Sequence, residues 1–391
     1  MAPTLENFGL SSLADFLDDR VIYRSLEPLD SRVQGLKRAR MHMGLHTTDI
    51  PRKLDRDYAK AAVWFMEQFH EVDGHPGEIE EILFIGDTLS GDGQAFLNMV
   101  ERSGWRGSCL IVSEKPDEDA AIDLSTLEGI VPGNRWSHLG DWLAALVEDG
   151  FKLDVSTVVV IDLDKTAIGA RGRNDKAIDK ARLTGIYRTM NSVLGSNFNQ
   201  EAFETDYNTL NQPRFHIITG DNQDYLGYIC LMLNGCVTSL EEVLAEVESG
   251  SLRSFQHLIR WIEILIKNGH CASESLRQAH EAVLMSVQAG DPTPFKRFRR
   301  EELIATLEHM NNLPDDAPVA DRLPAEITIT QEVREAALWL KGRGCLVTSM
   351  SDKPDEASRP DRRSNGESQP IHRALTHTVG TSIQDALDAI G

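Results

Sequence analysis

The strongest constraint on the fold is a short apolar run, residues 158–161, that ends in two acidic residues. Four β-branched residues in succession are typical of a strand buried on both faces, and such strands belong to parallel sheets covered by helices. Asp162 and Asp164 follow this run directly. Because residues two apart on an extended chain point the same way, the two carboxylates can converge at the carboxyl end of the strand, where open α/β sheets bind ligands.

Two carboxylates a few ångström apart repel each other by roughly 4 kcal/mol at an intermediate effective dielectric constant. Such a pair needs a proton or a divalent cation, and oxygen-only ligands suit Mg²⁺. The alternative is that both aspartates lie in a solvated loop, with Asp164 or Thr166 capping the next helix. The choice depends on whether the chain supplies further parts of a phosphoryl-transfer site.

A second apolar run, residues 82–85, is followed by Gly86 and Asp87 and, five residues after Asp87, by Asp92. Glycine allows close approach of the backbone, so the two acids could face one ligand across the loop. The alternative is a glycine-rich turn in which Asp87 or Asp92 caps the following helix.

Strands and helices alternate on both sides of a helical middle segment. We expect helices at 54–69, 95–102, 139–147 and 331–341, and further strands at 109–112 and 345–350. This alternation predicts an α/β fold with a Rossmann-like parallel sheet and helices on both faces. Residues 167–327 show mainly helical patterns, with one strand-like run at 215–219, and indicate a large all-helical insert. The predicted domains are therefore 1–166 with 328–391, and 167–327.

Net charge limits the binding partners of the protein, and cysteine content bears on its cellular compartment. The 391 residues contain 40 Lys and Arg against 61 Asp and Glu, which gives a net charge of −21. This charge opposes binding to nucleic acid or to an anionic membrane, so an anionic substrate needs a local positive pocket or a metal ion. The cysteines are scattered and indicate reduced core thiols of a cytoplasmic protein; they are Cys109, Cys230, Cys236, Cys271 and Cys345.

Targeting signals are not evident either. No apolar run reaches the roughly 18 residues of a membrane span. Residues 1–17 lack a basic segment followed by an apolar one, which a secretory signal requires. We therefore expect a cytoplasmic location and no membrane partner, and nothing in the sequence supports a homo-oligomer.

Residues 158–166, an apolar strand followed by D-x-D-x-T, resemble the first motif of the haloacid dehalogenase-like (HAD) phosphohydrolase superfamily. The resemblance implies that Asp162 is the nucleophile that takes the phosphoryl group and that Asp164 is the general acid and base. Thr166 would order the loop at the phosphate-binding site. A carboxylate can attack phosphorus in line while a second acid protonates the leaving alkoxide, and Mg²⁺ offsets the repulsion between carboxylate and phosphate.

Two further strands resemble other motifs of this superfamily. The second motif, a Ser or Thr at the end of the neighbouring strand, is matched by Ser351 after the strand at 345–350. Thr348 and Ser349 are alternatives, and a plain helix cap is the structural explanation for Ser351.

The fourth motif, an apolar strand followed by Gly-Asp and another acid, is matched by Asp87 and Asp92. By the resemblance, these two residues would hold Mg²⁺ together with Asp162 and the backbone carbonyl of Asp164. A competing Gly-Asp pair at Asp221 lies inside the helical segment, which favours Asp87.

The order of the motifs is unusual, because the fourth precedes the first. The third motif, a lysine that neutralises nucleophile and phosphate, is matched by Lys53, which stands just ahead of the helix that leads into the Asp87 strand. A circular permutation would explain this order, with motifs three and four followed by one, the helical insert and two. Lys60, Lys353 and Arg373 are alternatives, and Lys53 could also be a solvated surface lysine.

The resemblance thus implies a Mg²⁺-dependent phosphatase that acts on a small phosphorylated metabolite, with the insert as a helical cap. Arg171, Arg173 and Lys176 could face a substrate anion or form a solvated helix start. Asp164 argues against a dehalogenase and a transport ATPase, whereas a phosphomutase would share every motif. A non-catalytic phosphate- or Mg²⁺-binding module is a second class. A third class is a glycosyltransferase that uses D-x-D to bind a metal. Thr166 and the Asp87 motif argue against this class.

Overall fold

The structure is a computed structural model that describes residues 4–270, 273–360 and 369–391. The chain forms two compact units. The first comprises residues 1–47, 51–181 and 306–391, and the second comprises residues 48–50 and 182–305. All described strands lie in the first unit, and both inner boundaries fall within the segment 167–327 that the sequence assigned to an insert.

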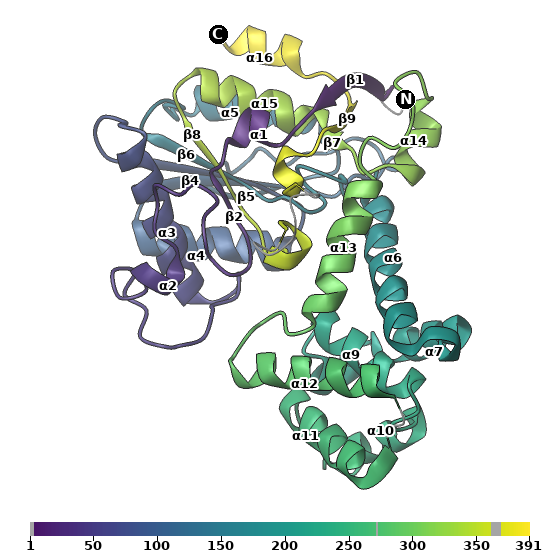
Figure 1. The fold of residues 1–391 in the computed structure, drawn as a ribbon. Coiled ribbons are helices and arrows are strands. Elements are labelled where there is room, and N and C mark those ends of the chain that lie inside the picture. Colours follow the sequence, from purple (N-terminus) through teal and green to yellow (C-terminus); the bar gives the residue numbers. More distant parts are fainter. Residues whose placement is uncertain (1–3, 271–272, 361–368) are drawn as a thin grey trace. The chain divides into compact units, whose positions relative to one another are not determined.

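The first unit is built around a six-stranded parallel sheet with the order β2–β8–β6–β3–β4–β5 (Figure 1). Its strands are β2 (Val21–Ile22), β3 (Glu81–Gly86), β4 (Arg106–Val112), β5 (Gly129–Gly133), β6 (Thr157–Ile161) and β8 (Leu346–Met350). The four β-branched residues of β6 are fully buried, as their composition predicts. The predicted α/β class with a parallel sheet is therefore confirmed, and β6 lies between β8 and β3.

Helices cover both faces of this sheet. Figure 1 shows α3 (Arg56–Val72) and α4 (Gln94–Ser103) on one face, and α1 (Ala14–Leu17), α5 (His138–Glu148) and α15 (Gln331–Gly342) on the other. In α3 the buried Tyr58, Phe65 and Phe69 recur at helical spacing, so one stripe of the helix packs on the sheet. The short α2 (Leu36–Ala39) precedes α3, and α16 (Gln384–Ile390) packs on α5.

A second, three-stranded sheet has the order β1–β9–β7, with β1 (Glu6–Ser11), β7 (Ile329–Thr330) and β9 (Thr376–Gly380). β9 pairs antiparallel with β1 and parallel with β7, so segments near both chain ends share one sheet. Beside it α14 (Val319–Ala325) supplies Arg322, whose buried guanidinium contacts Glu326 at 2.6 Å.

The second unit is helical in its described residues. It contains α7 (Gln200–Leu210), α8 (His216–Thr219), α9 (Gln223–Asn234), α10 (Leu240–Glu248), α11 (Phe255–Leu265) and α12 (Glu274–Gln288). Two helices, α6 (Asp175–Leu194) and α13 (Lys296–Glu308), run from one unit into the other. The hydrophobic core of the second unit includes Leu226, Ile229 and Leu258, which are all nearly inaccessible to solvent.

The strand expected at 215–219 is wrong. These residues form the end of a 3₁₀ turn, Pro213–Phe215, and the single turn of α8. Phe215 and Ile218 are buried three residues apart while Ile217 is exposed, which is helical spacing. A short apolar run cannot be assigned to strand or helix by periodicity alone, and here Pro213 at the first position favours the helical turn.

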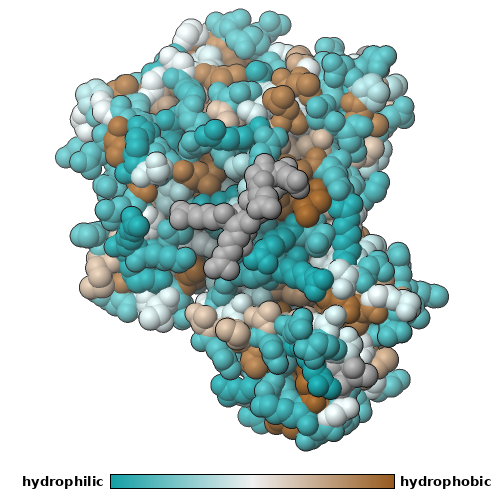
Figure 2. Space-filling model, in the orientation of Figure 1, coloured by the Kyte–Doolittle hydropathy of each residue, from teal (hydrophilic) through white to brown (hydrophobic). Residues whose placement is uncertain are grey.

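The described surface agrees with the charged composition. Hydrophilic residues predominate on the face shown in Figure 2, and apolar side chains form small separate groups. No helix among the described residues combines the length and apolar character that crossing a membrane requires.

Of the cysteines, Cys109, Cys230 and Cys345 are buried free thiols, Cys236 is exposed rather than in the core, and Cys271 lies outside the described residues.

We expect Leu143→Ala in α5 to lower the free energy of unfolding of the first unit by about 3 kcal/mol, because a fully buried side chain leaves a cavity. Urea unfolding followed by tryptophan fluorescence in a Trp261→Phe background measures this unit, since the other five tryptophans lie in it. The control Leu375→Ala, at a side chain 52% exposed, should change stability by less than about 0.5 kcal/mol. Equal effects of the two substitutions would contradict the assigned core.

Candidate active site

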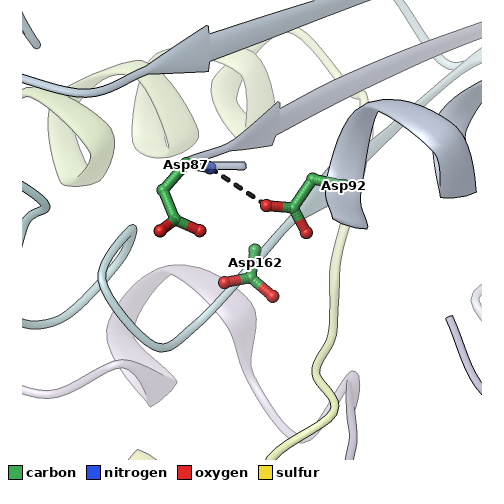
Figure 3. Close-up of side chains that lie close together, drawn as sticks. All are labelled: Asp87, Asp92 and Asp162. Atoms are coloured by element: carbon green, nitrogen blue, oxygen red, sulfur yellow. Dashed lines mark hydrogen bonds between the residues drawn. The ribbon is translucent and has the colours of Figure 1, made fainter. Parts of the chain in front are cut away.

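Three aspartates converge at the carboxyl ends of two neighbouring strands. Asp162 follows β6, Asp87 follows β3, and Asp92 lies in the π-helical turn Leu89–Gly93 that precedes α4. One carboxylate oxygen of each residue lies within 4.8 Å of the others, and all three residues are buried. Figure 3 shows the three side chains pointing toward one another. The structure therefore brings together the side chains of Asp87, Asp92 and Asp162, which the sequence predicted as metal ligands, whereas the carboxylate of Asp164, expected beside that of Asp162, is not part of this cluster.

Gly86 makes room for this arrangement. A Cβ atom at this position would lie 2.6 Å from the Cβ of Asp92, closer than two such atoms can approach. Asp92 Oδ2 accepts hydrogen bonds from the backbone N–H groups of Asp87 (3.1 Å) and Thr88 (3.0 Å). Its Oδ1 faces the other way and accepts from Lys53. The alternative of a helix cap is wrong for Asp92, because Gly93 occupies the N-cap position of α4 and the Asp92 side chain binds the backbone that precedes it.

Lys53 is the cation of the cluster. Its Nζ donates to Asp92 Oδ1 at 2.7 Å and to Asp162 Oδ1 at 2.5 Å, and the residue is 5% exposed. The alternative of a solvated surface lysine is therefore wrong for Lys53. It describes Lys60 instead, which is partly exposed and pairs with Asp57 on its own helix.

Burial and the neighbouring charges shift the pKa values of all four groups in this cluster. Burial raises the pKa of Asp162 well above its usual range, and the neighbouring carboxylates add to this effect although Lys53 opposes it. Burial and the charge of Asp92 likewise raise the pKa of Asp87 to about 6. For Asp92, burial is outweighed by Lys53 and by the backbone N–H groups, which lower its pKa to about 2. Burial would lower the pKa of Lys53, but Asp162 and Asp92 raise it well above its usual value.

Ser351 and Asp164 lie on the other side of β6, toward β8. Ser351 is buried directly after β8, and its Oγ accepts from the backbone N–H of Lys353 at 3.2 Å. It is not a helix cap, since the 3₁₀ turn Asp355–Ala357 has Pro354 at that position. Lys353 Nζ donates to Asp164 Oδ2 at 3.2 Å. Lys353, one of the alternatives for the third-motif lysine, thus contacts Asp164, the proposed general acid.

The alternatives to Ser351 make structural hydrogen bonds. Thr348 Oγ1 donates to the carbonyl of Arg20 at 2.8 Å, and Ser349 Oγ donates to the carbonyl of Ile161 at 2.6 Å. Both residues lie within β8 rather than beyond its end. Arg373, the remaining alternative for the third motif, is largely exposed and pairs with Asp19.

Thr166 is held in the loop after β6. Its carbonyl accepts from Thr330 Oγ1 at 2.5 Å, and the backbone N–H of Thr330 donates to Ala167 O at 2.9 Å, which joins this loop to β7. The Thr166 hydroxyl is buried and has no hydrogen-bond partner among the described residues. A buried polar group without a partner costs about 1–3 kcal/mol. This hydroxyl is therefore free to bind a ligand.

Some contacts were not predictable from motifs. Arg171 pairs through Nε with Asp87 Oδ2, whereas the sequence suggested either a contact with a substrate anion or a solvated helix start. Arg173 is buried between Glu114 and Glu332 and so has a structural role, while Lys176 is exposed. These pairs join loops that follow different strands, and no pattern in the sequence indicates them.

Two further residues, Tyr58 and Asp221, bear on the assignment of the site. Tyr58 places a second buried hydroxyl without a described partner on the helix that follows Lys53. The competing Asp221 lies at the end of α8 in the second unit and is exposed, so it belongs to no strand end.

The residues present fit a hard divalent cation. The cluster found among the described residues offers only carboxylate oxygens, which suit Mg²⁺, and it offers no nitrogen or sulfur ligand. Three acidic groups face two cations, Lys53 and Arg171, so one negative charge is left without a counter-charge when all five are ionised. Asp87 and Asp162 are the residues that would hold the ion, because both oxygens of Asp92 already accept hydrogen bonds, whereas Arg171 and Lys53 each contact one oxygen of Asp87 and of Asp162.

We expect Mg²⁺ affinity to rise as the pH is raised through about 6, because Asp87 must lose its proton before it can bind the cation. Below that pH the affinity should fall by about tenfold per pH unit for each proton released. Calorimetric titration in buffers of different ionisation enthalpy measures both affinity and proton release. Asp221→Asn should keep the wild-type profile and Asp87→Asn should bind weakly; an affinity independent of pH would contradict the raised pKa of Asp87.

Comparison of the chain with protein-family models, with curated proteins and with solved structures found no match. Inferences about function therefore depend on the motif resemblance and on the geometry of this site.

Proposed function

We propose that the protein is a Mg²⁺-dependent phosphatase of the HAD-like superfamily that hydrolyses a small phosphorylated metabolite through an aspartyl-phosphate. The observation that carries this proposal is the contact of Lys53 with Asp162, which lies 109 residues further along the chain. The third-motif lysine of this superfamily contacts the nucleophile, whereas a lysine that points into solvent would make no such contact. Residues from three separate segments thus meet at the positions that the resemblance assigns to them.

The sheet order supports a circular permutation of a Rossmann-like core. β6, which carries the nucleophile, has the strand leading to Ser351 on one side and the strand leading to Asp87 on the other. A chain that began at β6 would read the motifs in the usual order if its present end segments were joined. β1 and β9 are paired neighbours, so segments near the two chain ends lie side by side. Residues 167–327 would then form the helical cap insert of that superfamily.

Each residue has a defined step in this reaction. Asp162 forms a bond to phosphorus while the bond to the leaving oxygen breaks, and Asp164 donates a proton to that oxygen. Asp164 then takes a proton from water, whose oxygen displaces Asp162 and releases inorganic phosphate. Lys53 stabilises the negative charge of Asp162 and of the phosphoryl group. Bound Mg²⁺ would offset the repulsion between carboxylate and phosphate.

Ser351 and Thr166 are suited to hold the phosphoryl oxygens. Both hydroxyls are buried at the carboxyl ends of neighbouring strands, and that of Thr166 has no partner within the described chain. Lys353 is placed to keep Asp164 oriented between the two proton transfers. A phosphomutase would use the same residues and differ in the acceptor, so the products decide between the two activities.

We expect Asp162→Asn to lower kcat for an aryl phosphate by at least about a thousandfold, because the amide cannot form the phosphoryl ester. Release of the phenol with and without Mg²⁺ measures this loss. Asp221→Asn, the same substitution in the competing Gly-Asp pair, is the matched control and should retain wild-type activity. Activity in Asp162→Asn would refute the nucleophile, and an inactive wild type over a broad panel of phosphomonoesters would favour a binding module.

Lys53→Met should lower kcat/KM about a hundredfold or more, because the charge of nucleophile and phosphate is no longer neutralised. Lys60→Met changes a neighbouring lysine outside the cluster and should have less than about a twofold effect, as most surface substitutions do. The same aryl phosphate assay compares the two variants, with thermal unfolding as a check on folding. Similar losses in both variants would remove the support that the Lys53 contact gives to a permuted fold.

A further inference from the structure

A cleft of about 580 Å³ opens beside Asp87 at the carboxyl ends of β3 and β4, with Ile130 of β5 in its wall. Asp87 and Arg171 are the charged side chains that line it, and the remainder of the lining is hydroxyl, amide or aliphatic. Leu89 and Leu97 form part of its wall and are 63% and 43% exposed. Six of its nine lining residues are polar or charged and three are aliphatic, so the lining suits a small polar molecule, and the volume is in the range of small-molecule sites.

The backbone of Arg171 is fixed at the edge of this cleft. Its N–H donates to Lys165 O at 2.8 Å, and its carbonyl accepts from the N–H of Glu114 at 3.1 Å and from Trp136 Nε1 at 3.4 Å. Gly172 follows with φ of +79°, and a Cβ there would lie 1.9 Å from Glu114 O. The main chain can therefore approach so closely only with glycine, and the backbone of Arg171 is held at the edge of the cleft.

The guanidinium of Arg171 and a divalent cation would compete for the same carboxylate. Arg171 pairs with Asp87 Oδ2, and Asp87 belongs to the carboxylate cluster that suits Mg²⁺. A cation bound to Asp87 weakens this pair by charge repulsion and by competing for its oxygens. The displaced guanidinium stays tethered to the cleft, where the other lining residues offer it no anionic partner.

We propose that this cleft binds the organic part of the phosphorylated substrate and that Arg171, released from Asp87 when Mg²⁺ binds, recognises a second anionic group on it. That group is a carboxylate or a further phosphoryl group, both of which match the planar fork of a guanidinium. The inference rests on the proposed phosphatase function and adds the substrate class to it. Binding is then ordered, since metal must precede the anion.

Binding of non-hydrolysable phosphonates tests this without turnover. Calorimetry at saturating Mg²⁺ compares 3-phosphonopropionate with propylphosphonate, which differ in the carboxylate. The wild type should bind the carboxylate compound at least about tenfold more tightly, and Arg171→Gln should lose this preference. Arg102→Gln, at an exposed arginine of α4 outside the cleft, is the matched control and should keep it.

A second measurement uses Mg²⁺ alone. Because Arg171→Gln removes the competitor for Asp87, it should bind Mg²⁺ about threefold to tenfold more tightly than the wild type. Equal wild-type affinity for the two phosphonates, or no binding of either, would overturn the proposal, as would a preference retained in Arg171→Gln or a Mg²⁺ affinity unchanged by it. Failure to hydrolyse any phosphomonoester would instead overturn the proposed function, and these binding results would still decide the role of Arg171.

Discussion

One buried ammonium group holds the candidate site together. Lys53 contacts Asp92 and Asp162, and without it three carboxylates within a few ångström would face one another in a region from which water is excluded. Charges buried in this way are stable only when they are paired. A single side chain therefore joins the segment before α3 to the residues that follow β3 and β6.

The position of β6 in the middle of the sheet explains why these segments can meet. Parallel strands present their carboxyl ends along one edge, so residues that follow β8, β6 and β3 lie side by side although the chain visits these strands in a different order. Glycine at position 86 then allows Asp92 to close the cluster. The geometry of the site thus follows from sheet topology and one close backbone contact.

Long or strongly patterned elements were predictable from the sequence, whereas short edge strands were not. The helix expected at 331–341 has nearly the same bounds as α15, and the run at 158–161 makes up all but the first residue of β6. β2 and β7 have two residues each, and β5 contains glycine and proline, so none of them carries a readable pattern. The motif residues could be found because chemistry fixes their spacing along one segment. The Arg171–Asp87 pair and the contact between Lys353 and Asp164 could not, because they join side chains whose proximity only the folded chain creates.

The small sheet links the periphery of the first unit to its centre. Its strand β7 is hydrogen-bonded to the loop that carries Thr166, and its strands β1 and β9 come from near opposite ends of the chain. Displacement of either terminal segment would therefore act, through neighbouring strands, on the backbone of the loop after β6. The place where an expression tag is attached, or the extent to which an end is trimmed, would then bear on the geometry of the candidate site and not only on solubility.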